Sequence, residues 1–346
     1  MPRPPKIDWP RVAEALATRF PRKSLHPSVL AWAESGSEAA QRSWAVGFSG
    51  GADSLALLLL LWAHWPERRK RVVALHFDHR LRGRASTADA RFCASVCEAL
   101  GVRYVGGVWA SARKGASEAE ARTARFAFFQ RELGRRRIRA LWLGHQQDDI
   151  AETILMRLAR GSGTAGLAAP RPLQLMPAGR VHVRPLLTLK KSELTTALLN
   201  AGAIWREDAS NETMGYYRNR IRHGALPQWC AAAEGRDALG GAALSRELLE
   251  EDDTALEAWV DELNLLSADG RQLGVKALHG KPRAVVRRAL HRWLVRQADI
   301  GDLSRQGFMG LLAAVEKGSF TRFSLGRSGF AVIRKGTLVF EAKPTV

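Results

Sequence analysis

A short apolar run that ends in a glycine-rich turn is the feature that most constrains this chain. The run 44–48 is followed by Ser-Gly-Gly-Ala-Asp-Ser at 49–54, and a leucine-rich segment extends from there to His64. This order predicts a buried strand, a tight turn and a helix. Glycines let the backbone approach an anion closely, and exposed N–H groups at a helix start stabilise negative charge. The segment therefore predicts a phosphate-binding turn.

Further apolar runs alternate with helical patterns along the first two thirds of the chain. After an amphipathic segment at 9–32, we expect strands at 72–77, 102–109 and 140–143, and helices at 86–100, 117–133, 147–160 and 189–201. Short strands separated by helices are typical of a parallel sheet that is covered on both faces. The fold class predicted is α/β with a doubly wound parallel sheet. The stretch 161–180, rich in Gly, Ala and Pro, is expected to be a loop.

The last third has a different pattern, which predicts a second domain. Helical periodicity runs from about 231 to Leu266 and again over 283–297, and 326–341 alternates like a hairpin around Lys335-Gly336. We predict a boundary near residue 230. The expected domains are a nucleotide-binding catalytic domain at 1–230 and a smaller, basic α+β domain at 231–346 that contacts the polyanion.

The charge balance predicts a polyanionic partner. The chain has 53 Lys and Arg against 34 Asp and Glu, a formal net charge of +19. Such an excess favours nucleic acid first and an anionic membrane surface second. The basic runs 68–71, 135–137 and 287–288 are each typical of a solvated face, but together they favour a salt-sensitive contact with a polyanion.

Cysteine usage and hydropathy predict the compartment. Cys93, Cys97 and Cys230 do not form a metal-binding pattern, which predicts a reducing environment. The longest apolar run, 55–62, is far shorter than a bilayer crossing requires, and the first ten residues lack the apolar core of a secretion signal. We expect a cytoplasmic protein without a membrane partner.

A pair of acidic residues lies just past the fourth predicted strand. Asp149 and Glu152 are three apart and share one helix face, at the carboxyl edge where open α/β sheets bind ligands. Two such acids could bind Mg²⁺ or the ammonium group of an amine substrate. Acids in the first turn of a helix also complement its dipole, which is the alternative interpretation.

Two other motifs compete with the phosphate-binding interpretation. Gly47, Ser49 and Gly51 match the G-x-S-x-G elbow of serine hydrolases, although here the elbow closes the first strand and no late histidine is singled out. The G-x-G-x-x-G match at 161–166 follows a predicted helix rather than a strand, so the dinucleotide interpretation lacks its context.

In order along 44–227, the motifs resemble one family. S-G-G-x-D-S between strand and helix is the signature of the PP-loop pyrophosphatase superfamily, whose members cleave ATP between the α and β phosphates to adenylate a substrate. The later motifs resemble those of tRNA(Ile)-lysidine synthetase, at 75–82, 118–122, 144–163, 184–187, 207–211 and 217–222.

The resemblance implies a ligase that forms a carbon–nitrogen bond. That family joins free L-lysine to C2 of the wobble cytidine in the CAU anticodon of tRNA(Ile). The reaction passes through an adenylated tRNA and releases AMP and diphosphate. The implied cofactors are ATP and Mg²⁺, and the implied partners are tRNA(Ile) and free lysine. The chain ends soon after residue 340, which resembles a shorter form of the family.

The resemblance also implies roles for individual residues. The ATP site would comprise Ser49, Gly50, Gly51, Ala52, Asp53 and Ser54, with Asp53 as metal ligand and His76 beside the adenosine. Asp149 and Glu152 would receive the amino groups of lysine. Asn211 and Arg218 would act near the adenylated cytidine, and Arg220 and Arg222 would meet phosphate.

The chain departs from the family pattern at three positions: Asp78, Gln146 and Ile150 stand where the family usually has Asn, His and Gln. Two alternatives remain at this stage, a PP-loop tRNA thiolase and a catalytically idle RNA-binding relative. The oligomeric state is open, a homodimer included.

Overall fold

A computed structural model describes residues 7–80, 84–112, 116–207, 215–297, 303–326 and 329–343. Internal contacts divide the chain into two compact units, Met1–Leu248 and Leu249–Val346. The division falls within helix α12 (Ala238–Glu262), whereas the sequence predicted a domain boundary near residue 230. The difference arises because Ala242 and Ala243, on the first half of this helix, are buried in a core cluster of the first unit.

Six strands form the sheet of the first unit, in the order β3-β2-β1-β4-β6-β5. They are β1 (Trp44–Gly47), β2 (Val72–Asp78), β3 (Arg103–Val108), β4 (Ala140–Trp142), β5 (Leu173–Met176) and β6 (Arg180–Val183). The first four and β6 are parallel, and β5 runs antiparallel to β6. The mostly parallel sheet is confirmed. The loop expected at 161–180 is wrong, since it contains β5 and the short helix α8 (Thr164–Leu167).

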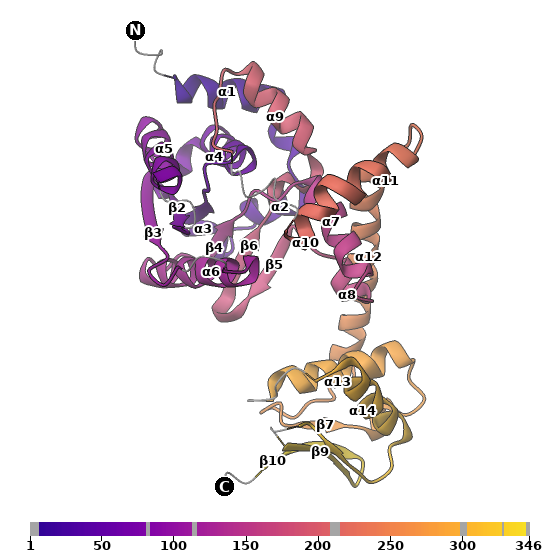
Figure 1. Ribbon diagram of the computed structural model, residues 1–346. Helices are drawn as coiled ribbons and strands as arrows, with labels where there is room; N and C mark the ends of the chain where they lie inside the picture. Colours follow the sequence, from indigo (N-terminus) through magenta and orange to yellow (C-terminus); the bar gives the residue numbers. More distant parts are fainter. Residues whose placement is uncertain are drawn as a thin grey trace. The chain divides into compact units, whose positions relative to one another are not determined.

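Helices cover both faces of this sheet (Figure 1). They are α1 (Trp9–Arg19), α2 (Pro27–Glu34), α3 (Glu38–Gln41), α4 (Ala52–His64), α5 (Arg84–Leu100), α6 (Glu118–Arg135), α7 (Gln147–Leu158) and α9 (Lys191–Asn200). Because strand side chains alternate between faces, Trp44 and Val46 join the core under α1, α4, α5 and α9. Ala45 points to the other face, where Phe128 and Leu133 of α6 cover it.

Short 3₁₀ helices connect several of these elements, at Arg22–Ser24, Pro66–Arg71, Pro177–Gly179, Pro185–Thr188 and Lys276–Leu278. After the sheet, α10 (Tyr217–Arg220) continues through a π-helical turn at Ile221–Ala225 into α11 (Leu226–Ala232). Pro227 has no N–H to continue the α-helical ladder, which accounts for a wider turn just before it. Arg218 and Arg222 lie on this irregular helix.

The second unit is a smaller α+β domain, as the sequence predicted. An antiparallel sheet in the order β7-β10-β9-β8 comprises β7 (Gln272–Gly274), β8 (Thr321–Ser324), β9 (Gly329–Arg334) and β10 (Thr337–Ala342). Helices α13 (Arg283–Arg296) and α14 (Arg305–Lys317) contribute Trp293 and Leu311 to its core. The predicted hairpin is confirmed: Lys335 and Gly336 both have positive φ, as a two-residue turn requires.

Within the described ranges, no helix combines the length and the apolar composition that a bilayer crossing needs.

Candidate active site

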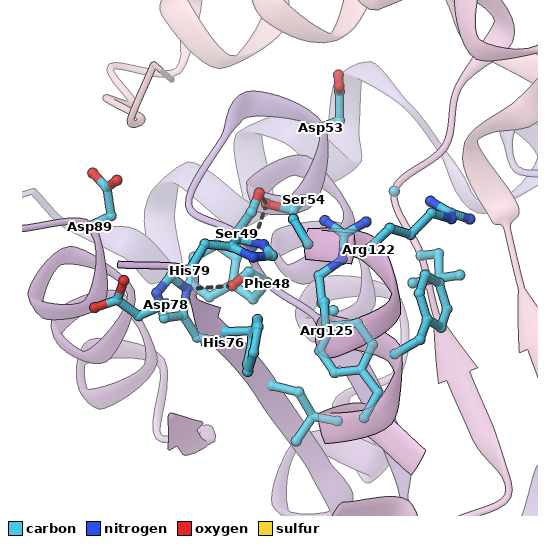
Figure 2. A pocket seen from close by; sticks show the side chains of 18 of the residues that line it. Phe48, Ser49, Asp53, Ser54, His76, Asp78, His79, Asp89, Arg122 and Arg125 are labelled. Atoms are coloured by element: carbon cyan, nitrogen blue, oxygen red, sulfur yellow. Dashed lines mark hydrogen bonds between the residues drawn. The ribbon is translucent and has the colours of Figure 1, made fainter. Parts of the chain in front are cut away.

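A cavity of about 860 Å³ lies in the first unit, where parallel strands β1, β2 and β4 end (Figure 2). Six of the predicted site residues line it: Ser49, Asp53, Ser54, His76, Asp149 and Arg218. Gly50, Gly51 and Ala52 belong to the turn beside it, and Glu152 is buried directly behind Arg218. Asn211 lies outside the described residues. Residues that the sequence singled out therefore meet at one cavity, and their individual roles, including that of Asn211, stay predictions.

The turn between β1 and α4 is held by its own hydroxyl groups. Ser49 and Ser54 hydroxyls lie 3.0 Å apart (Figure 2), and the N–H of Gly51 donates to Ser49 Oγ at 3.3 Å. Gly50 has φ +89°, and a Cβ there would lie 3.0 Å from Cys93 Sγ. Both the backbone conformation and the space thus favour glycine, which keeps the turn open to a phosphate group.

A second glycine sets the depth of the cavity. A Cβ at Gly144, just after β4, would lie 2.8 Å from the carbonyl oxygen of Asp53. The backbone that leaves β4 therefore packs directly against the first turn of α4. This contact brings the segment that contains Asp149 next to the phosphate-binding turn.

Asp53 is a half-buried carboxylate whose Oδ1 atom is shielded from solvent. Its Oδ1 has no hydrogen-bond partner among the described residues. Burial, and then repulsion from Asp149, raise the pKa of Asp53 to about 7. A cation would remove both penalties, so the site fits Mg²⁺. Mg²⁺ is usually bound by one or two carboxylates together with substrate phosphates.

His76, on β2, lines the cavity, and its hydrogen bonding fixes which ring nitrogen carries the proton. Its Nδ1 lies 2.9 Å from the carbonyl oxygen of Phe48 (Figure 2), so Nδ1 donates and carries the proton. Burial lowers the pKa of His76, which keeps the ring neutral and leaves Nε2 as an acceptor. Nε2 is buried and has no partner within the described part of the chain. The ring stacks on Tyr104 with centroids 6.2 Å apart.

The acid pair on α7 is bound by two arginines. Arg218 reaches Asp149 Oδ1 at 2.5 Å and Glu152 Oε2 at 2.7 Å, and Arg222 Nε donates to Glu152 Oε1 at 2.6 Å. Asp149 is 7% exposed and Glu152 is 1% exposed. The pair therefore binds cationic nitrogen groups in this structure. Arg222, which the resemblance had placed against phosphate, contacts Glu152 here, and its role at a phosphate stays a prediction.

The three departures from the family pattern are accommodated locally. Gln146 caps helix α7, because its side chain accepts the N–H of Asp148 and its own N–H donates to Asp149 Oδ2. Ile150 is buried in an apolar cluster with Leu187 and points away from the charged groups. Asp78 lines the cavity and accepts the N–H of Arg80 at 2.7 Å.

Sequence reasoning gave no separate role to several basic residues at the cavity. Arg122 and Arg125, one helical turn apart on α6, line the cavity (Figure 2). Arg184 is 5% exposed and donates to His145 Nδ1 at 3.2 Å, and burial lowers its pKa to about 10. The available signals were the motifs 118–122 and 184–187, which contain Arg122 and Arg184, and the spacing that puts Arg122 and Arg125 on one helix face.

The structure does not favour the competing interpretations. Ser49 Oγ bonds Ser54 and Gly51, and no histidine contacts it among the described residues, as a hydrolase elbow would require. Cys93 and Cys97 are buried in the core, and burial raises the pKa of both thiols, to about 12 for Cys97. Such thiols are poor nucleophiles and metal ligands. The 161–166 motif follows helix α7 rather than a strand.

The fold and the turn define a PP-loop protein, and the model of the family described as "PP-loop domain" matches residues 25–229. The tRNA(Ile)-lysidine synthase of Geobacter sulfurreducens is 36% identical over 273 residues, which cover 76% of this chain and 56% of that protein. The enzyme of that name from Nitratidesulfovibrio vulgaris is 32% identical over 329 residues, covering 86% of this chain and 92% of that protein. The chain belongs to the tRNA(Ile)-lysidine synthase family.

The chain spans 53% to 60% of the length of three curated relatives, those of Geobacter sulfurreducens, Solibacter usitatus and Bacillus licheniformis. Among solved structures, the U34-tRNA thiolase NcsA from Methanococcus maripaludis matches with a TM-score of 0.50 and 16% identity. That match covers 69% of this chain and 78% of that chain. This likeness concerns the fold alone.

Proposed function

We propose that this protein ligates lysine to C2 of the wobble cytidine in the CAU anticodon of tRNA(Ile), with ATP as the activating substrate. One observation carries the proposal: a phosphate-binding turn and a buried pair of acids that already binds cationic nitrogen meet in one cavity. An ATP-dependent ligase of an amine substrate needs both features. The identity of the two other substrates, tRNA(Ile) and lysine, is taken from the names of the relatives.

The turn at 49–54 would bind the phosphates of ATP, and Asp53 would hold Mg²⁺. When bound, Mg²⁺ supplies positive charge that neutralises the phosphates as diphosphate leaves. The unpartnered carboxylate oxygen of Asp53 supports this role. His76 Nε2, an acceptor without a partner in the described residues, is suited to a hydroxyl or amino donor of the adenosine.

The reaction has two steps. The cytosine O2 attacks the α-phosphate of ATP, a P–O bond forms, and diphosphate leaves, which gives an adenylated tRNA. An amino group of lysine then attacks C2, the C–O bond to AMP breaks, and the amine loses a proton. Positioning and charge neutralisation are the main contributions that the protein makes to such displacements.

Asp149 and Glu152 would bind the ammonium form of lysine and orient it. In the structure their oxygens are taken by Arg218 and Arg222, so lysine must replace guanidinium contacts before it reacts. A carboxylate beside the amine could accept its proton. Arg218, released from the acids, would be free to neutralise the leaving AMP. A cytoplasmic location belongs to this proposal, since its tRNA substrate resides there.

The test follows radiolabelled lysine into a tRNA(Ile) transcript with a CAU anticodon, and measures diphosphate release in parallel. In Asp149→Asn we expect lysine incorporation to fall by about 100-fold or more, while diphosphate release without lysine persists. Asp148→Asn is the matched control, because Asp148 accepts the N–H of Lys191 and does not line the cavity. Absence of lysine-dependent labelling in the unmodified protein would overturn the proposal.

A further inference from the structure

A row of arginines lies at the amino ends of the parallel strands, opposite the carboxyl ends where the active site lies. Trp44, Val72, Ala140 and Val181 form one rung across β1, β2, β4 and β6. Arg71, Arg139 and Arg180 directly precede this rung on three of the strands. Arg180 begins β6, Arg71 ends the 3₁₀ helix before β2, and Arg139 comes just before β4, so the register of the sheet places their backbones in one row. Three strand spacings of about 4.8 Å separate the first from the last, so the row is about 14 Å long.

A basic hollow adjoins the row. It has a volume of about 260 Å³ and is lined by Gln41, Arg42, Ser43, Arg71, Arg136 and Arg137. Arg71 and Arg137 are exposed, and Arg180 is partly exposed. We call Arg42, Arg71, Arg137, Arg139 and Arg180 the basic edge. All five belong to the first unit.

Part of this charge has a structural use. Glu38 bonds both Arg42 and Arg139, and Glu132 bonds Arg136. Arg42 also donates to the carbonyl oxygen of Arg137 at 3.2 Å and thereby ties two loops together. The C-terminal dipole of α6 favours cations here but amounts to only about half a negative charge.

The rest of the charge is uncompensated. Arg71, Arg137 and Arg180 form no ion pair with any described residue. Three guanidinium groups that form no ion pair with the described residues therefore belong to this end of the strands. These arginines do not belong to the active site. They lie at the amino ends of the parallel strands and the active site lies at the carboxyl ends, and strand β2 alone, with seven residues, spans about 23 Å between the two.

We propose that the basic edge binds the phosphate backbone of RNA, as a contact surface separate from the active site. Guanidinium groups pair with phosphate oxygens through two parallel hydrogen bonds. Backbone charges of a duplex follow one another every few ångströms along each strand, so a row of about 14 Å meets several of them. Binding through this contact depends on charge and not on the base sequence of the RNA. It does not rest on the proposed ligation.

The test measures binding of a short labelled RNA duplex without an anticodon loop, over a range of salt concentrations. The edge variant is Arg71→Gln/Arg137→Gln/Arg180→Gln. The control variant, Arg11→Gln/Arg19→Gln/Arg236→Gln, removes the same charge from exposed positions elsewhere in the first unit. Thermal unfolding of both variants shows that they are folded.

For the edge variant we expect a dissociation constant about tenfold higher at low salt. The slope of log K against log salt should become shallower by about two to three, close to one per lost phosphate contact. The control should retain most of the unmodified slope. Equal slopes for edge and control variants would overturn the proposal. A protein that fails to ligate lysine but shows this slope difference would overturn only the proposed function.

Discussion

Two arginine–carboxylate clusters in this chain have nearly the same composition, and they differ in what surrounds them. In the first unit, Arg218 and Arg222 bind Asp149 and Glu152. In the second, Arg288 and Arg292 of α13 bind acids of α12, namely Asp253, Glu257 and Asp261. Both clusters place two arginines, four residues apart, against acids three or four residues apart.

The first cluster faces a cavity and lies beside Asp53, a carboxylate with an unpartnered oxygen. The second joins two helices of one small domain, and Arg288 is only 9% exposed. The surface role that the sequence predicted for the run 287–288 is therefore wrong for Arg288, which binds Asp253 at 2.5 Å. An ion-pair cluster by itself does not mark a functional site. A functional site is indicated by a cavity together with a neighbouring carboxylate oxygen that has no hydrogen-bond partner among the described residues.

The largest effect should come from Asp53→Asn. We expect ATP-dependent diphosphate release to fall by about 100-fold or more. The free energy of unfolding should rise by about 1 to 3 kcal/mol, because a half-buried carboxylate that Asp149 repels is removed. Denaturant unfolding and a diphosphate assay measure both. Asp253→Asn in the second cluster should do the opposite, with lower stability and unchanged release per folded molecule. A loss of stability in Asp53→Asn would contradict this contrast.

Next, Arg288→Ala should lower the free energy of unfolding of the second unit by about 3 to 5 kcal/mol, because the buried carboxylate of Asp253 loses its ion pair with this guanidinium group. Hydrogen exchange should accelerate in α13 and stay unchanged in β1. Arg287 is exposed on the same helix, so Arg287→Ala is the matched control, with an expected change within about 0.5 kcal/mol. Similar effects of the two substitutions would show that Arg288 has no structural role.

The smallest effect concerns pH. Burial, and then Arg184 and Arg122, lower the pKa of His182 to about 4. A histidine with a lowered folded-state pKa takes up its proton more readily when unfolded, so its contribution to stability is lost as the pH falls below about 6.5. Between about pH 7 and pH 5.5 this loss is about 1 kcal/mol. His182→Gln should be less acid-sensitive by that amount in urea unfolding. An identical pH dependence would refute the assignment.

Local sequence patterns predicted the helices, strands and turns that are stabilised by interactions between residues close together in the chain. The strand, turn and helix at 44–64 follow from an apolar run, two glycines and a leucine-rich segment, and they appear as β1 and α4. Strand β5 was missed because it is an edge strand with exposed central residues. It exists because β6 offers it a free edge, a condition that no window of sequence contains. Helix α14 and strands β6, β7 and β8 were missed as well.

By itself, the sequence determined the phosphate-binding turn, the spacing of Asp149 and Glu152, and the family, because a few neighbouring residues carry each of these features. Only the tertiary structure decided which charges meet. Arg218 lies 69 residues from Asp149 along the chain, yet the two side chains touch. The arginines of the basic edge come from separate segments, and the register of the sheet brings Arg71, Arg139 and Arg180 into one row. Electrostatic partners depend on distances in space, and folding alone sets those distances.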